Sequence, residues 1–112
     1  MNPIINIENK IELFTTELIQ FCKPLMLNKK YASAVSQLLN CESNIRMTIE
    51  FSKTVETSKE CYEKLTLTKE ELLLMEYFLS SLVNYDEKTV SSLLEKAKEI
   101  REEIESLVEN MN

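Results

Sequence analysis

Apolar residues recur every three or four positions along most of the chain, which is the spacing of one face of an α-helix. Four segments carry this pattern, and each ends near residues that favour turns or helix caps. The predicted helices cover about residues 5–23, 29–55, 58–83 and 87–110. Because the connections between them are short, neighbouring helices should run antiparallel. The pattern therefore predicts an all-α fold, an antiparallel up-down-up-down four-helix bundle formed by one domain over residues 1–112.

A short connection separates the first two predicted helices. Pro24 disfavours helical geometry at Lys23, so the first helix should end there. Asn28 belongs to the residue types that cap helices, and we expect it to start the second helix. The expected core face of the first helix contains Ile7, Ile11, Phe14, Leu18 and Phe21. That of the second helix contains Tyr31, Val35, Leu38, Ile45 and Ile49.

The third predicted helix has the most regular pattern. Thr57 and Glu60 have the spacing of a capping box at its start. Its core-facing seam contains Cys61, Leu65, Thr68, Leu72, Met75, Leu79 and Leu82. A second apolar stripe contains Leu67, Leu74 and Phe78, and it favours either self-association or a wide core-facing surface. Tyr77 and Phe78 are adjacent, so one of the two rings should leave the core.

The last predicted helix is amphipathic and strongly charged, and Asp86 is expected to cap its start. Its expected core face contains Val90, Leu93, Leu94, Ala97, Ile100, Ile104, Leu107, Val108 and Met111. The opposite face carries Lys98 with Glu102 and Arg101 with Glu105. Both pairs have the spacing of four that is typical of ion pairs on a solvated helix face.

The formal net charge is −6, and residues 86–112 hold eight acids and four bases. A negative chain repels phosphate backbones on average, so nucleic-acid binding would need a local basic patch. The candidate patch is Lys23, Lys29 and Lys30 around the first turn, together with Arg46. The acids of the last helix favour a basic protein partner instead, and they are Glu95, Glu99, Glu102, Glu103, Glu105 and Glu109.

The sequence contains no histidine and no glycine. Most proton shuttles and transition-metal sites use histidine, and phosphate-cradling loops use glycine, so we predict no enzyme activity, no metal and no cofactor. Cys22, Cys41 and Cys61 lie about twenty residues apart. This spacing and the odd number argue against disulfides and zinc, and they favour reduced thiols in or near the core.

Membrane insertion is not expected from the sequence. No window approaches the roughly 18 apolar residues of a membrane span. The first six residues do not combine a basic region with a following apolar stretch. We therefore expect a cytoplasmic protein without a membrane partner.

Several segments resemble a known bacterial family. They are Phe14 with Glu17-Leu18-Ile19, Tyr31 with Gln37-Leu38-Leu39, Ser43-Asn44-Ile45 with Ile49, Lys64-Leu65 with Leu67 and Glu71, and Glu76-Tyr77-Phe78-Leu79 with Leu82. Together they resemble the four-helix-bundle proteins of ribosomal RNA intervening sequences. That family is related to the accessory variability determinant proteins of diversity-generating retroelements. The resemblance covers most of the chain.

The resemblance implies a ring-like homo-oligomer, a pentamer, that acts as a non-catalytic accessory subunit of a reverse transcriptase or ribonucleoprotein. RNA contacts would then come from Lys23, Lys29, Lys30 and Arg46. The oligomer interface would include Leu74, Tyr77 and Phe78. The net charge supports an alternative hypothesis, in which the protein is an acidic protein–protein interaction module with no nucleic-acid role.

Overall fold

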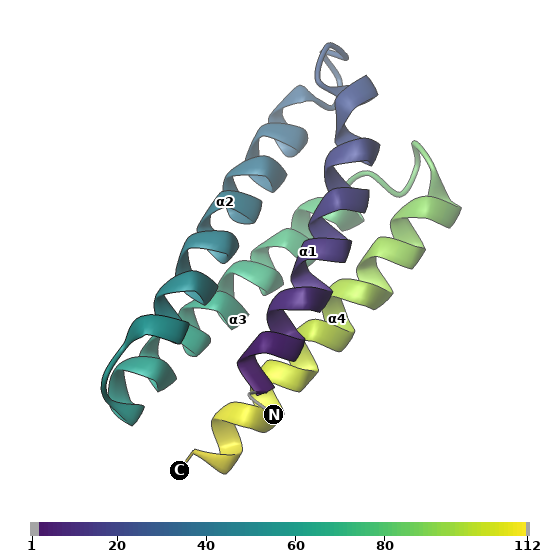
Figure 1. Cartoon of the computed structure of the whole chain (residues 1–112). Helices are drawn as coiled ribbons and strands as arrows, with labels where there is room; N and C mark the ends of the chain where they lie inside the picture. The colour runs from purple at the N-terminus through teal and green to yellow at the C-terminus, as the bar shows by residue number, and fades with distance from the viewer. Residues whose placement is uncertain (1–2, 112) are drawn as a thin grey trace.

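The computed structural model describes residues 3–111, and the helices in this range form a four-helix bundle, as the sequence predicted. The helices are α1 (Pro3–Cys22), α2 (Ala32–Thr54), α3 (Ser58–Ser80) and α4 (Glu87–Asn110), and the short 3-10 helix η1 (Lys23–Leu25) follows α1. Successive helices run antiparallel (Figure 1). The α1–α2 and α3–α4 connections lie at one end of the bundle, and the α2–α3 connection lies at the other.

The helices pack in a cyclic order, because α1 and α3 each contact both α2 and α4. The α2–α3 pair has the most extensive contact and the α1–α2 pair has the least. The bundle is elongated, measuring 44 × 20 × 19 Å along its principal axes. Of the four lateral sides that this order creates, the side formed by α2 and α3 lies opposite the side formed by α1 and α4.

Two of the predicted helix caps are confirmed. The Thr57 hydroxyl accepts a hydrogen bond from the Glu60 backbone N–H at 3.1 Å, and the Asp86 carboxylate accepts one from the Thr89 N–H at 3.1 Å. Each bond satisfies an N–H that has no partner within the first helical turn. Hydrogen bonds from the Thr89 side chain and from its backbone N–H lower the pKa of Asp86. These caps fix the starts of α3 and α4 where the sequence predicted them.

The predicted start of the second helix at residue 29 is wrong by three residues. Asn28 does not cap α2; its side-chain oxygen accepts a hydrogen bond from the Lys30 N–H at 3.0 Å and closes a local turn. The Asn28 carbonyl also accepts from the N–H groups of Tyr31 and Ala32. The Asn28 side chain therefore accepts its hydrogen bond within this turn, and α2 begins at Ala32.

The ends of the other helices also differ from the prediction by a few residues. α1 begins at Pro3, which fits a first-turn position because those N–H groups have no intrahelical acceptor. α3 ends at Ser80 rather than at residue 83, because the following residues form tighter turns with hydrogen bonds between residues three apart. Leu82 is fully buried although it lies beyond the helix.

The core contains most residues of the predicted stripes of all four helices. The other predicted positions are partly buried and pack against the core, namely Tyr31, Cys61, Leu94, Leu107, Val108 and Met111. The buried apolar residues include Ile7, Ile11, Phe14, Leu18, Val35, Leu38, Ile45, Ile49, Leu65, Leu72, Met75, Leu79, Val90, Leu93, Ala97, Ile100 and Ile104. Thr68 is fully buried among them. Its hydroxyl lies 2.8 Å from that of Thr48 on α2 and donates to the Lys64 carbonyl at 2.9 Å. The buried polar group is therefore hydrogen-bonded, as stability requires.

Candidate interaction surfaces

The outer surface of α2 and α3 carries a row of large apolar side chains in solvent, which we call the apolar face. It consists of Met47, Phe51, Leu67, Leu74 and Tyr77. Leu67 and Leu74 are seven residues apart and share one side of α3. The two helices meet on this face, because the Lys64 ammonium of α3 lies 5.4 Å from the centre of the Phe51 ring of α2. Exposed large apolar side chains gathered on one side of a bundle are typical of interaction sites, and here the exposed Glu70 lies between Leu67 and Leu74 on α3.

The structure separates the three predicted interface residues by exposure. Tyr77 is 71% exposed and Leu74 is 48% exposed, whereas Phe78 is half-buried and packs against the core. The rings of Tyr77 and Phe78 meet edge to face, with centroids 5.3 Å apart. The prediction that one ring leaves the core is confirmed, and that ring is Tyr77. Leu74 and Tyr77 are therefore available to a partner without unfolding the monomer.

The first connection carries a second surface, the basic tip, formed by Lys23, Met26, Leu27, Lys29 and Lys30. All five side chains are exposed, and Leu27 is 95% exposed. Residues 18–41 contain these three lysines and no acid. The aromatic rings behind the tip are engaged with one another, since Tyr85 lies edge to face with both Phe21 and Tyr31.

Arg46 does not lie with the three lysines. It is in the middle of α2, more than three helical turns from the first connection, and forms an ion pair with Glu42. Glu42 is only 4% exposed, so Arg46 compensates the charge of a buried carboxylate. The structure therefore gathers Lys23, Lys29 and Lys30 in one connection and places the fourth predicted contact elsewhere.

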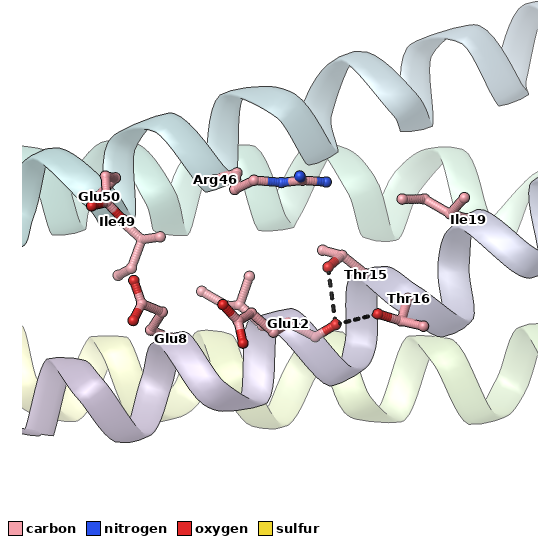
Figure 2. A pocket seen from close by; sticks show the side chains of 9 residues that line it. Glu8, Glu12, Thr15, Thr16, Ile19, Arg46, Ile49 and Glu50 are labelled. Atoms are coloured by element: carbon pink, nitrogen blue, oxygen red, sulfur yellow. Dashed lines mark hydrogen bonds between the residues drawn. The ribbon is translucent and has the colours of Figure 1, made fainter.

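Arg46 lines a groove between α1 and α2 that sequence reasoning missed. The groove has a volume of about 350 Å³ and is lined by Glu8, Ile11, Glu12, Thr15, Thr16, Ile19, Arg46, Ile49 and Glu50. Figure 2 shows Arg46 extending along the groove, with the α1 side chains on the opposite wall. Thr15 and Thr16 both donate to the Glu12 carbonyl, so their hydroxyls are satisfied within α1. The sequence signal for this groove was Thr15, a small polar residue on the buried side of α1.

The charges of this groove sum to a negative value. Lys53 pairs with Glu8 at 2.5 Å and with Glu50 at 3.1 Å, and these hydrogen bonds raise the pKa of Lys53. Glu12 contributes a further carboxylate to the wall. Including the buried Glu42, four carboxylates surround two cations. Glu8, Glu42 and Glu50 are paired with these cations, and Ile11 and Ile49 on the floor are each 2% exposed, so the floor offers little accessible apolar surface.

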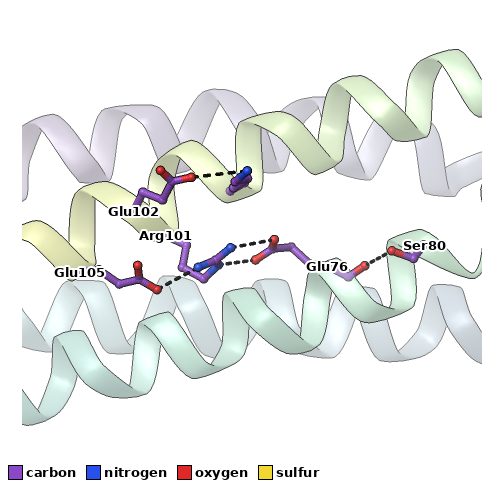
Figure 3. Close-up of polar contacts among 6 residues, drawn as sticks. Glu76, Ser80, Arg101, Glu102 and Glu105 are labelled. Carbon is purple, nitrogen blue, oxygen red and sulfur yellow. Dashed lines mark hydrogen bonds and ion pairs between the residues drawn. The ribbon is translucent and has the colours of Figure 1, made fainter.

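Arg101 links α3 to α4. The sequence predicted that Arg101 pairs with Glu105 on a solvated face, and this is wrong in part, because Arg101 is largely buried and also binds Glu76. Its guanidinium donates to the Glu76 carboxylate through two nitrogens, at 2.7 and 3.3 Å, and to Glu105 at 2.8 Å (Figure 3). The Arg101 side chain is 17% exposed. The hydrogen bonds to Glu76 raise the pKa of Arg101 above its usual range. Lys98 and Glu102, by contrast, form the exposed pair that was predicted, at 3.9 Å.

The three thiols are free, and two of them are buried. Burial raises the pKa of Cys22 to about 11. Burial, together with the nearby Glu71 carboxylate, raises that of Cys41 to about 11 as well. Neutral buried thiols are poor nucleophiles. Within residues 3–111, no cluster of three or more potential metal ligands is present, and no helix is long and apolar enough to cross a membrane.

The fold is similar to a crystal structure of a protein of unknown function from the S23 ribosomal protein family of Bacteroides thetaiotaomicron VPI-5482. The TM-score is 0.85 with 18% sequence identity, and the match covers 96% of this chain and 99% of that one. No protein-family model matches the sequence, and no curated protein is significantly similar to it. At 18% identity, the structural similarity establishes a shared fold.

Proposed function

We propose that this chain is a non-catalytic binding protein that assembles with itself through the apolar face. The observation that carries the proposal is the set of exposed large apolar side chains on α2 and α3. The described part of α4 exposes none of that kind, and α1 exposes Ile5 and Leu13. An apolar surface on one side of a bundle gains free energy when a second copy covers it. The absence of histidine from the sequence supports a role in binding rather than catalysis.

The first experiment measures the mass of the assembly. We expect the unaltered chain to form a homo-oligomer, a pentameric ring if the family resemblance holds, by size-exclusion chromatography with light scattering. The double variant Leu67→Glu and Leu74→Glu places two charges on the apolar face and should yield monomers with unchanged helical circular dichroism. The control is Leu13→Glu on α1, whose side chain is more exposed than Leu67 or Leu74, and it should leave the mass unchanged. A monomeric unaltered chain would refute the proposal.

Tyr77 is the expected anchor of the interface, because a large exposed aromatic ring on an interaction surface contributes strongly when it is buried. Tyr77→Ala should weaken self-association at least tenfold. Phe78→Ala should mainly lower the stability of the monomer, since that ring packs against the core. Equal effects of the two variants on the assembly mass would argue against this assignment.

A second candidate function is that of an accessory subunit of a reverse transcriptase or ribonucleoprotein, as the family resemblance implies. The basic tip favours this candidate, because three exposed lysines gathered in one connection attract a polyanion, and Glu17 and Asp86 lie to one side of it, around Pro24. The joint change of Lys23, Lys29 and Lys30 to alanine should then weaken RNA binding and reduce its salt dependence. Arg46→Ala should have a smaller effect, since Arg46 is distant from the tip and paired with Glu42. Recovery of partners from cells with and without ribonuclease would distinguish RNA-mediated from direct association.

The alternative, an acidic interaction module without nucleic acid, depends on the outer face of α4. Glu95, Glu99, Glu102 and Glu109 are exposed there. A basic partner would be attracted to them, and its association rate would fall with added salt. Charge reversal of these four residues would abolish that dependence, whereas RNA binding at the tip would be unaffected or strengthened.

A further inference from the structure

The positive charge of this acidic protein is concentrated in one stretch of the chain. Of the 13 bases and 19 acids in the sequence, residues 18–49 hold four and one, and the remaining residues hold nine and eighteen. The single acid of this stretch, Glu42, is buried and paired with Arg46. The end of α1, the first connection and most of α2 therefore carry cations without an exposed acid of their own.

A small hollow opens on α2 beside the basic tip, and we call it the α2 hollow. It has a volume of about 190 Å³ and is lined by Met26, Ala32, Val35, Ser36 and Leu39. Val35 is buried, whereas Met26 is 52% exposed and Ser36 is also exposed. Ala32 and Ser36 lie one helical turn apart, and their small side chains leave space beside Met26. The hollow thus offers accessible apolar surface for a side chain of a partner.

Backbone hydrogen bonds hold the tip lysines next to this hollow. The Met26 N–H donates to the Lys23 carbonyl at 3.3 Å, and the Ala32 N–H donates to the Asn28 carbonyl at 2.9 Å. The other two tip lysines lie within the turn that this second bond closes. Because the backbone is already ordered, little conformational entropy is lost when a partner binds.

We propose that the α2 hollow and the lysines of the basic tip together bind an acidic segment of a partner protein that carries an apolar side chain among its carboxylates. The apolar side chain enters the hollow against Met26 and Leu39, and the carboxylates pair with the lysines. Leu27, which follows Met26 and is 95% exposed, is covered by the same segment. The contact does not rest on the proposed self-assembly, because it uses no residue of the apolar face.

The carboxylates at this end of the bundle do not occupy the proposed site. Glu17 and Asp86 line a separate hollow around Pro24. Glu17 pairs with Lys96 at 2.6 Å, and Asp86 accepts the capping hydrogen bond from Thr89. Both carboxylates are therefore engaged with α4, and the lysines beside the α2 hollow remain available to an acidic partner.

A nucleic acid fits these observations less well than an acidic polypeptide. A phosphate backbone would pair with the lysines but would leave Met26 and Leu27 in water. Base stacking would need an open aromatic ring. The Tyr31 ring is engaged instead, because it lies edge to face with Tyr85 and has the Lys30 ammonium 5.4 Å from its centre.

The test follows methionine methyl groups by NMR on the full chain labelled with ¹³C-methyl methionine. Met26 lines the α2 hollow, Met47 lies on the apolar face and Met75 is in the core, so their resonances report on three separate places. The probe is a short synthetic peptide of aspartate and glutamate residues around a central pair of leucines. We expect this peptide to shift the Met26 resonance and to leave those of Met47 and Met75 unchanged.

Two control peptides separate charge from apolar contact. Replacement of the leucines by serines should weaken binding about tenfold, because no apolar side chain then enters the hollow. Replacement of the acids by asparagine and glutamine should also weaken binding and remove its dependence on salt. Equal binding of the leucine and serine peptides would overturn the proposal, because charge attraction alone would then explain the association.

Two variants of the protein locate the site. Ser36→Phe fills the hollow from an exposed helix position and should weaken peptide binding about tenfold, with the core methionine resonance unchanged. The variant with Lys29→Glu and Lys30→Glu should lose binding. Its control carries Lys59→Glu and Lys98→Glu, which change the net charge equally at exposed positions elsewhere, and it should retain binding. Equal losses in the two double variants would overturn the proposal.

Other occupants of the surface give distinct results in the same experiment. Movement of the Met26 resonance on dilution of the protein alone would show that a second copy covers the hollow. A shift caused by an oligothymidylate strand but not by the acidic peptide would assign the surface to nucleic acid. Either result would overturn the proposal. A monomeric unaltered chain would refute the proposed self-assembly but would leave the expected peptide binding unchanged.

Discussion

The α2–α3 and α1–α4 sides of the bundle bury similar apolar cores but differ at the surface, where the exposed Leu13 of α1 is surrounded by ion pairs. On the α1–α4 side, Lys10 pairs with Glu103 and Lys96 pairs with Glu17 across the helix boundary. On the α2–α3 side, the helices meet inside through Thr48 and Thr68 and present the apolar face outside. The core residues thus define the fold, whereas the residues beside them indicate which side is suited to a partner.

The difference also separates two kinds of stabilisation. Exposed ion pairs contribute little and weaken with salt, so the α1–α4 side is suited to permanent contact with water. The apolar face contributes nothing until it is covered, and its burial does not weaken with salt. The α2–α3 side is therefore the better candidate for an interface.

The largest expected effect distinguishes the inner from the outer residues of α3. Leu72→Ala should lower the free energy of unfolding by about 2–5 kcal/mol, because the fully buried side chain leaves a cavity. Leu74→Ala, two positions away on the apolar face, should change the stability of the dissociated monomer by less than about 0.5 kcal/mol. Urea denaturation at low protein concentration measures both. Similar losses would mean that Leu74 packs within its own monomer.

The next largest expected effect on stability concerns the Arg101–Glu76 ion pair, which joins α4 to α3. Glu76→Gln should cost about 1–3 kcal/mol, because Arg101 would keep a largely buried charge without its two-bond acceptor. Glu102→Gln is the matched control in the exposed pair with Lys98 and should cost almost nothing. Thermal denaturation of the two variants side by side would show whether burial separates them.

A thiol on each side gives a pH-dependent comparison. The folded pKa of both Cys22 and Cys41 is about 11, above the ordinary value of 9.0. As the pH rises from 9 toward 11, the unfolded chain releases thiol protons that the folded chain retains. Each thiol should therefore lower the unfolding free energy in this range, by at most about 1.4 kcal/mol per pH unit.

Glu71→Gln distinguishes the two thiols, because only Cys41 has this carboxylate among the causes of its shift. The substitution should lower the pKa of Cys41 and leave that of Cys22 unchanged. The pH dependence of alkylation, followed at each cysteine by mass spectrometry, checks this result. An equal change at both residues would contradict the assigned role of Glu71.

The smallest expected effect tests the ion pairs of the α1–α4 side. Glu103→Gln should cost about 0.2–1 kcal/mol at low salt, and the cost should largely vanish in about 1 M NaCl. Self-assembly through the apolar face should persist in the same high-salt buffer. Denaturation and light scattering in paired buffers would reveal both behaviours. Salt-induced dissociation of the apolar-face assembly would reverse the comparison.

The sequence by itself determined the helices, their core stripes and two of their caps. A stripe such as Leu65, Leu72 and Leu79 repeats with helical spacing, so its burial follows from the chain alone. The Thr57 and Asp86 side chains accept hydrogen bonds from backbone N–H groups three residues later, so the local sequence suffices to predict these caps. Asn28 was misassigned because the same side chain type can cap a helix or close a turn.

Only the tertiary structure decided which side chains the residues beside the core stripes contact. Periodicity places Glu76, Tyr77 and Phe78 around one helix, but the rotation of α3 within the bundle sends Glu76 to Arg101 and Tyr77 into solvent. The separation of Arg46 from the basic tip, and the groove between α1 and α2, likewise depend on how two helices are spaced. These features arise from the simultaneous packing of four helices, because spacing along one chain segment carries no information about the surface that faces it.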